Sequence, residues 1–285
     1  MPRSRLLRRG ATAAAVLALA GAAAAQASHD RGDRWSPRDD DARMFYATTD
    51  QNLLLQFDEN SPERLRDVQA ITGLPAGVKL RGIDFRPMTG DLYGVGSDSV
   101  VYRLNPQTAI AVAEGPAFTP ALRGNSFGVD FNPTVDKIRV TSDQAQNLRL
   151  NVDEGTVLAA DADLNPGMPQ VVGSAYTNSG FSATRPTVTR LFAIDAANDM
   201  LFLQNPPNNG TLTMGKRLGV DVGPQAGFDI AGDDASPTGY IATKSQRFRG
   251  SSLYKVDVNS GRARSLGKVG GGRRITITGL AAWQD

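Results

Sequence analysis

The sequence predicts an all-β fold, a five-bladed β-propeller whose ring is closed by pairing of the N- and C-terminal strands. Three observations predict it. A unit of short strands with alternating apolar residues recurs every 45 to 54 residues. The last unit breaks off at the C-terminus, and the N-terminal part of the domain holds strands that lack a first member. One such unit cannot bury its own apolar face, so the copies must pack against one another.

The unit over residues 128–151 is the most regular copy. Its sequence, GVDFNPTVDKIRVTSDQAQNLRLN, contains three strand-like runs at 129–132, 138–142 and 147–151. Apolar and polar residues alternate along each run, which is typical of half-buried antiparallel strands. Asn132-Pro133 ends the first run, because proline has no N–H for the sheet and restricts the residue before it.

The other copies begin at the same kind of position, a glycine followed by an apolar residue in most of them. These glycines are Gly82, Gly128, Gly173, Gly227 and Gly279. The runs at 44–47 and 52–58 supply the strands that the last copy lacks, and we number that closing blade 1. Outer strands are expected at 65–72, 109–113 and 156–160. Polar insertions at 178–187 and 232–238 fall in loops, where the specificity of a repeat scaffold usually lies.

Three motifs carry a resemblance to a known family. GVDFNPTVDKIRV, QNLRLN and, at 204–210, QNPPNNG follow one another in this order. Over about residues 44–282 the chain resembles an exported bacterial family, the domain of unknown function 4394. The resemblance implies a β-propeller-like architecture and export, and it assigns no catalytic residue.

The N-terminus predicts export. Residues 1–27 combine four arginines, an alanine-rich apolar run and an Ala-Gln-Ala cleavage site, which together indicate a cleaved signal peptide, by the general secretory rather than the twin-arginine route. Residues 28–43 form a charged linker and residues 44–285 the propeller domain. We therefore expect a periplasmic or extracellular protein with no stable membrane insertion after cleavage.

Composition excludes several classes of function. Without the four arginines of the signal, 27 basic residues face 29 acidic ones, so nothing indicates a nucleic-acid partner. The chain has no cysteine, and its single histidine, His29, lies in the linker. A cysteine nucleophile, a Ser-His-Asp triad and a histidine-ligated metal are therefore excluded from the propeller domain.

Three aspartates are the repeated candidates for a site. Asp84, Asp130 and Asp229 each stand two residues after the first glycine of a unit, where alternation turns them away from their apolar neighbours. If these strands are innermost, the carboxylates line the central channel, where they could bind a hard cation such as Ca²⁺. Alternatively, each carboxylate accepts backbone N–H groups and holds one blade to the next. Ala175 and Ala281 occupy the position in the other two blades, so a ring of carboxylates is incomplete.

Two weaker patterns have simple structural interpretations. The run Asp161 to Gly167 resembles a calcium loop, but proline stands at the turn position and no glutamate stands at the twelfth. We interpret it as a loop between blades. The segment 205–210, NPPNNG, has the composition of a turn between two strands, with a ligand-facing rim loop as the alternative.

Two functional hypotheses follow. The first is a non-catalytic binding or scaffold module without a cofactor, which takes a small-molecule, glycan or protein ligand at the channel mouth or the rim loops. The second is a carboxylate-based hydrolase or lactonase acting at the channel, with Ca²⁺ as its possible cofactor, because glycosidase chemistry needs no histidine. The missing catalytic residue types favour the first hypothesis.

Overall fold

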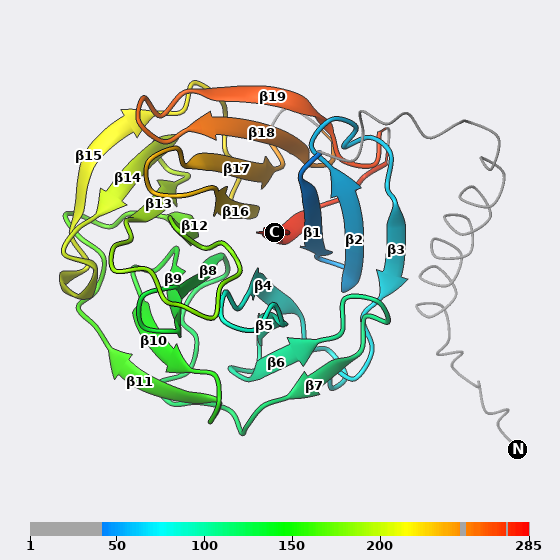
Figure 1. The fold of residues 1–285 in the computed structure, drawn as a ribbon, viewed down its shortest axis with the longest axis horizontal. Helices are drawn as coiled ribbons and strands as arrows, with labels where there is room; N and C mark the ends of the chain where they lie inside the picture. The colour runs from blue at the N-terminus through cyan, green and yellow to red at the C-terminus, as the bar shows by residue number, and fades with distance from the viewer. Residues whose placement is uncertain (1–41, 246–248, 272, 285) are drawn as a thin grey trace, which may run out of the picture. The chain divides into compact units, whose positions relative to one another are not determined.

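Five antiparallel sheets of four strands each surround one axis (Figure 1). The computed structural model describes residues 42–245, 249–271 and 273–284. The predicted five-bladed propeller is confirmed over these residues. The predicted signal peptide, and the linker up to residue 41, lie outside the described residues. Among the described residues, no helix is long and apolar enough to cross a membrane.

Four strands, ordered from the axis outward, make each blade. Blade 1 comprises β20 (Ile277–Ala282), β1 (Met44–Thr49), β2 (Leu53–Asp58) and β3 (Asp67–Ala70). Blade 2 comprises β4 (Leu80–Phe85), β5 (Leu92–Gly96), β6 (Val101–Leu104) and β7 (Ala111–Ala113). Blade 3 comprises β8 (Phe127–Asn132), β9 (Lys137–Ser142), β10 (Asn147–Asn151) and β11 (Thr156–Ala160). Blade 4 comprises β12 (Val171–Tyr176), β13 (Leu191–Asp195), β14 (Met200–Gln204) and β15 (Leu212–Arg217), with the 3₁₀ turn η1 (Pro207–Asn209) before β15. Blade 5 comprises β16 (Ala226–Ala231), β17 (Thr238–Thr243), β18 (Ser252–Asp257) and β19 (Ala263–Lys268).

Blade 1 closes the ring as the sequence predicts. The C-terminal strand β20 pairs antiparallel with the N-terminal strand β1, with Tyr46 opposite Ala281 and Ala47 opposite Leu280. The last strand therefore completes the sheet that the first strands began. Because the two ends of the domain share one sheet, opening the ring requires the loss of these backbone hydrogen bonds.

The inner strands of the blades are buried on both faces, which the alternating pattern of the sequence did not predict. Alternation in β9 places Ile138 and Val140 on one face and Arg139 and Thr141 on the other, which predicted a half-exposed strand. Instead, Arg139 and Thr141 are also buried, with exposed fractions of 1% and 0%. The reason is that each blade of a propeller packs face to face with a neighbour on either side. The apolar cluster on one face of blade 3 contacts blade 2, and the polar face contacts blade 4.

The inner strands run in the same direction, so the ring has a start face, where they begin, and an end face, where they finish. Near their beginnings, the five repeat glycines form a ring around the axis. A Cβ atom on Gly82 would lie 2.5 Å from Val129, and one on Gly173 would lie 2.6 Å from Phe228. In each case the obstacle is the residue after the glycine of the next blade. The cavity at this level is about 10 Å³, roughly the space of one water molecule.

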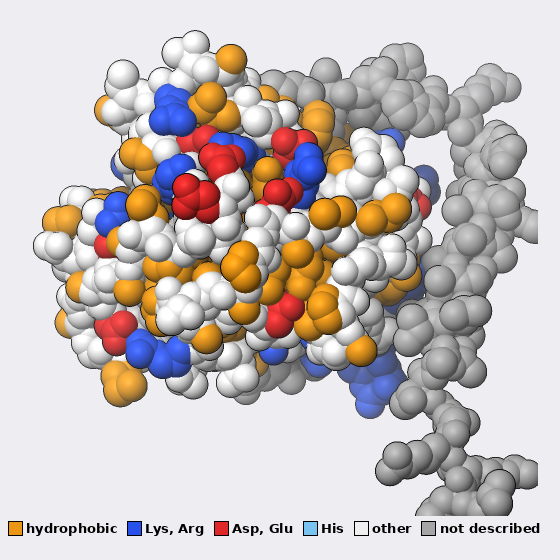
Figure 2. All heavy atoms as spheres, turned by 90° about the horizontal axis from the view of Figure 1, so that it is seen from below, with side chains coloured by type: hydrophobic (Ala, Val, Ile, Leu, Met, Phe, Trp, Pro, Cys, Tyr) orange, Lys and Arg blue, Asp and Glu red, His pale blue; other side chains and the backbone are white. Residues whose placement is uncertain are grey.

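One side of the molecule mixes charges of both signs (Figure 2). Figure 2 shows Lys and Arg side chains interspersed with Asp and Glu along the upper part of the face it draws, with hydrophobic side chains scattered below. That face therefore presents no electrostatic field of a single sign.

Replacing one glycine of the ring should destabilise the whole propeller. In Gly227→Ala the new Cβ would lie 2.5 Å from the backbone nitrogen of Leu280, which cannot move without displacing β20. We expect a loss of about 1–3 kcal/mol in the free energy of unfolding, because a packed interior does not accommodate an extra methyl group. Urea denaturation measures it.

Gly180→Ala is the matched control. Gly180 lies in the loop between β12 and β13, and nothing lies within 4 Å of the place that its Cβ would take. Its stability should match that of the unsubstituted protein. Equal stability of the two variants would show that the inner strands tolerate a wider ring.

Candidate functional site in the central channel

The structure brings the three repeated aspartates together at the axis. Asp84 lies on β4, Asp130 on β8 and Asp229 on β16, and one carboxylate oxygen of each lies within 4.8 Å of the others. Their side chains are almost fully enclosed, with residue exposures of 4%, 1% and 1%. The repeat places them there, because two residues beyond each glycine the chain again faces the axis side of its strand.

The backbone explains why carboxylates stand at this point. An innermost strand pairs with its neighbour along one edge only, so its other edge turns unpaired N–H groups toward the axis. Three of these N–H groups donate to the aspartate of the preceding blade. Phe131 donates to Asp84 at 2.7 Å, Tyr176 to Asp130 at 3.0 Å, and Ala282 to Asp229 at 2.6 Å. The aspartates thus connect blades 2 and 3, 3 and 4, and 5 and 1.

Two blades carry alanine in place of the aspartate, and the N–H groups left without an acceptor there bind to the same three carboxylates. Ala175 and Ala281 offer no acceptor to the N–H groups of Ile230 and Phe85, which follow them around the ring. Those donors turn instead to the aspartate immediately before them in the chain: Ile230 to Asp229 at 2.6 Å, and Phe85 to Asp84 at 2.8 Å. Asp84 and Asp229 therefore accept two N–H groups each and Asp130 accepts one. All five inner strands have this N–H satisfied by three carboxylates.

Three buried carboxylates at this distance cannot all carry a full charge without a counter-charge. Burial raises the pKa of Asp84 and Asp130 well above the usual range, and the neighbouring aspartates raise both further. Burial also raises the pKa of Asp229 to about 7, against the hydrogen bonds from Ala282 and Ile230 and the charge of Arg43, which lower it. The counter-charge can come from protons or from a cation.

The fit of a cation is only partial. Oxygens within 4.8 Å of one another allow one ion to contact all three side chains, at the ligand distances usual for Ca²⁺. However, five of the six carboxylate oxygens already accept backbone N–H groups, and Ca²⁺ takes about six to eight oxygen ligands. The assignment of Asp84, Asp130 and Asp229 as metal ligands stays a prediction.

The end face of the channel is covered by one loop. Residues 177–190, the crossing loop, connect β12 to β13, and Figure 1 shows this connection passing in front of β8 and β9. Phe181 packs its ring 5.7 Å from that of Phe85 and 4.7 Å from that of Trp283. The N–H of Ser182 donates to the carbonyl of Pro87. The crossing loop therefore reaches from blade 4 to blades 1 and 2 and screens the aspartates from solvent on this side.

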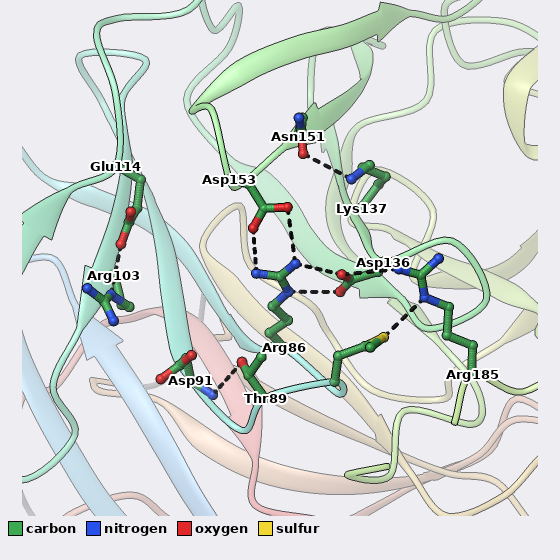
Figure 3. A network of polar contacts seen from close by, with 11 residues as sticks. Arg86, Thr89, Asp91, Arg103, Glu114, Asp136, Lys137, Asn151, Asp153 and Arg185 are labelled. Carbon is green, nitrogen blue, oxygen red and sulfur yellow. Dashed lines mark hydrogen bonds and ion pairs between the residues drawn. The ribbon is translucent and has the colours of Figure 1, made fainter. Parts of the chain in front are cut away.

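Charged groups fix the crossing loop at two points. At its last residue, Arg190 pairs with Asp234 of blade 5 at 2.7 Å. Five residues earlier, Arg185 lies 3.5 Å from Asp136, which also binds Arg86 (Figure 3). Arg86 extends this network to the exposed Asp153 and lowers its pKa. The insertion that the sequence placed at 178–187 is thus a bridge between blades, not a free rim loop.

The three motifs of the family resemblance meet at a buried arginine that sequence reasoning missed. Arg139 of β9 donates to Asn147 at 2.7 Å, to Asn208 of η1 at 2.8 Å and to Asp161 at 2.7 Å. Asn147 in turn donates to the carbonyl of Pro207 at 3.0 Å. The NPPNNG segment is therefore a connector that locks blade 4 onto blade 3. An arginine within an alternating strand, followed by two asparagine-rich motifs, was the available signal.

This polar lock accounts for the calcium-like run as well. The carboxylate of Asp161 pairs with Arg139 and with Arg149, and that of Asp163 pairs with Arg123. The apolar cluster between blades 3 and 4 is small, formed by Ala145, Leu164, Val171, Ala193 and Leu212. Charged hydrogen bonds therefore replace part of the apolar packing found between the other blades.

Comparisons with known proteins identify a family but no activity. A family model described as "Domain of unknown function (DUF4394)" matches residues 53–281. No curated protein matches the chain. Among solved structures, a structural genomics protein of unknown function from Bacteroides thetaiotaomicron is 16% identical, with a TM-score of 0.48, over 78% of this chain and 57% of that one. A chain of the nidogen/laminin complex is 14% identical, with a TM-score of 0.46, over 85% of this chain and 98% of that one. Kuenenia stuttgartiensis hydrazine synthase is 10% identical, with a TM-score of 0.42, over 72% of this chain and 52% of that one.

These likenesses concern shape and carry no information on function. The chain spans little more than half the length of the Bacteroides protein and of the hydrazine synthase chain.

Asp84 accepts two N–H groups and Asp130 accepts one, so substitution of the two residues should affect stability differently. Asp84→Asn turns an NH₂ group toward one of the two N–H groups that Asp84 accepts, which leaves a buried donor unpaired and should cost about 1–3 kcal/mol. Asp130→Asn keeps an oxygen for Tyr176 and directs its NH₂ group to the other carboxylates, so stability should be retained or improved. Urea denaturation at pH 7 compares them. Equal losses would contradict the assignment of the hydrogen bonds.

The raised pKa values predict that stability falls as the pH rises. The unfolded chain releases these protons near pH 4, whereas the folded cluster keeps protons up to about pH 7 for Asp229. A group whose pKa is raised by folding contributes stability that is lost as the pH rises through the folded value. In chelator-treated protein, we expect the free energy of unfolding to fall between about pH 5 and pH 7.5, by on the order of 1 kcal/mol per pH unit for each retained proton.

Asp130→Asn is the control for this titration, because it removes the proton that Asp130 retains and should reduce the pH dependence by that share. The lowered pKa values of Asp153, Asp234 and Asp257 act below this window and do not mask it. Stability that stays constant or rises over the window would contradict retained protons. A saturable rise of the midpoint with Ca²⁺ at about pH 7.5, lost in Asp130→Asn, would instead identify a cation as the counter-charge.

Proposed function

Because the chain belongs to the DUF4394 family of unknown function, we propose from its own geometry that the propeller is a non-catalytic binding or scaffold module. One observation carries the proposal. The acidic residues that the sequence repeats, and that an enzyme of this composition would use, are committed to backbone N–H groups around the axis. These carboxylates stabilise the contacts between neighbouring inner strands.

The spacing of the carboxylates also favours binding over hydrolysis. Glycosidases hold their two carboxyl groups about 5–5.5 Å or 6.5–9.5 Å apart, with the sugar between them. Here the three side chains approach within 4.8 Å, the glycine ring leaves about 10 Å³ below them, and the crossing loop lies above. A sugar or lactone ring has no room between these groups. The observation on the enzymatic side is the pKa of Asp229, about 7, which suits a general acid.

The place of action that we propose is outside the cytoplasm, in the periplasm or the extracellular space. The support is the sequence of residues 1–27, with its arginines, apolar run and cleavage site. A closed ring suits such a place, because it resists unfolding without disulfides. The ligand we expect is a small molecule, a glycan or a protein, held at a channel mouth or on the loops around it.

A paired assay tests the proposal. Purified protein is incubated with chromogenic glycosides, lactones and esters, and in parallel its thermal unfolding is followed against a panel of glycans and small metabolites. We expect no turnover above that of Asp130→Asn, and a saturable rise of the midpoint with at least one compound, since a ligand that binds only the native state stabilises it. Steady turnover that Asp130→Asn lacks would overturn the non-catalytic proposal.

A further inference from the structure

The start-face mouth of the channel carries a charge that the fold does not use. A shallow cavity there is lined by polar residues of four blades: Arg81, Asn125, Ser126, Gln225 and Thr278. Arg81 stands directly before the repeat glycine Gly82, at the beginning of β4. Its side chain therefore lies at the edge of the opening, next to the narrowest part of the channel.

Arg81 departs from the repeat. The residues in the same place, directly before the glycine of each other blade, are Phe127, Val172, Ala226 and Thr278. Three of these are apolar and the fourth is small and uncharged, so closure of the ring does not need a guanidinium at this position. A residue that departs from the local pattern without stabilising the fold is a candidate for a functional role.

Arg81 is half-buried, yet no residue in the described part of the chain accepts a hydrogen bond from its guanidinium or forms an ion pair with it. Two other partly buried arginines have carboxylate partners: Arg86 has Asp136, and Arg190 has Asp234. A guanidinium carries five donors in a fixed fork. Those of Arg81 are open to solvent at the mouth and are available to an acceptor supplied by a ligand.

The surroundings of Arg81 suit a negative group. Gln225 and Asn125 line the same cavity, and the side-chain amide of each can present an NH₂ donor. On the same face, Lys79 and Lys244 lie near Asp50, and their charges lower its pKa against burial, which raises it more strongly. Asp50 and Asp143, which accepts the N–H of Asn125, balance these two lysines, so the positive charge at the mouth is that of Arg81.

We propose that the start-face mouth binds an oxyanion, a carboxylate or a phosphate group of the ligand, through Arg81 and the amides of Gln225 and Asn125. An arginine fork matches the two oxygens of such a group. The cavity holds about 10 Å³, and the glycine ring blocks the channel behind it. The charged end of the ligand therefore enters the mouth and the rest stays outside, where the loops of the start face contact it.

This inference rests on the proposed binding role, since it names the chemical group that this role would recognise. The two fail separately. Turnover in the substrate screen overturns the non-catalytic role whether or not Arg81 binds an anion. Failure of anion binding removes the assignment of Arg81 and leaves the substrate screen unaffected.

The test is a titration followed by nuclear magnetic resonance of the arginine side-chain Nε–H signals. Sodium phosphate and sodium acetate are the two probes, each exchanged against sodium chloride at constant ionic strength. We expect a saturable shift of the Arg81 signal with at least one probe, which distinguishes phosphate from carboxylate recognition. Arg81→Gln should weaken binding at least tenfold, and Arg81→Lys, which keeps the charge but not the fork, should weaken it less.

Arg64→Gln is the matched control. Arg64 is exposed in the loop between β2 and β3, at the opposite end of the strands, so its loss should leave the titration unchanged. Arg81→Gln should fold normally, because it breaks no ion pair within the described residues, and its thermal midpoint verifies this. Unsaturable shifts with both probes, or equal binding by Arg81→Gln and Arg64→Gln, would overturn the assignment.

Discussion

The close approach of five inner strands around one axis governs the rest of this structure. Without side chains at the repeat glycines, each strand lies against the residue after the glycine of the next blade. That approach turns one edge of every inner strand toward an axis with almost no room for water. The N–H groups on that edge need acceptors, and the three aspartates supply them. Acidic residues at the centre are therefore a consequence of closing a small ring.

The same solution creates an electrostatic difficulty. Carboxylates are strong acceptors for N–H groups, but three of them buried together repel one another and lose their hydration. Two blades carry alanine at this position. Asp84 and Asp229 each accept a second hydrogen bond, from the N–H of the residue that follows them in the chain, so no further carboxylate is needed. Three acids thus serve five strands. Protons or a cation then neutralise what remains, which couples the stability of the ring to its surroundings.

Much of the fold could be predicted from the sequence because the same pattern occurs in every blade. The glycine spacing predicted the number of blades, and the truncated last copy predicted the closure between β20 and β1. The convergence of Asp84, Asp130 and Asp229 also followed from their equal positions. The sharing of five N–H groups did not, because it depends on side-chain rotamers next to the two alanine blades. Arg139 was missed since alternation marked it as exposed, and only the packing of blade 4 buries it.

The repeated residues of this chain have structural explanations, and the function that we propose is assigned to an unrepeated one. Asp84, Asp130, Asp229 and the glycines recur, and each recurrence has a mechanical reason at the axis. The family motifs around Arg139 lock blade 3 to blade 4, so they too are explained by folding. Arg81, which closure of the ring does not explain, has no counterpart in the other blades. Arg81 is charged where the other blades are not, and it lies at the mouth that the crossing loop does not cover. The common positions of the ring are employed in closure, so the binding role that we propose is assigned to such a single departure from the repeat.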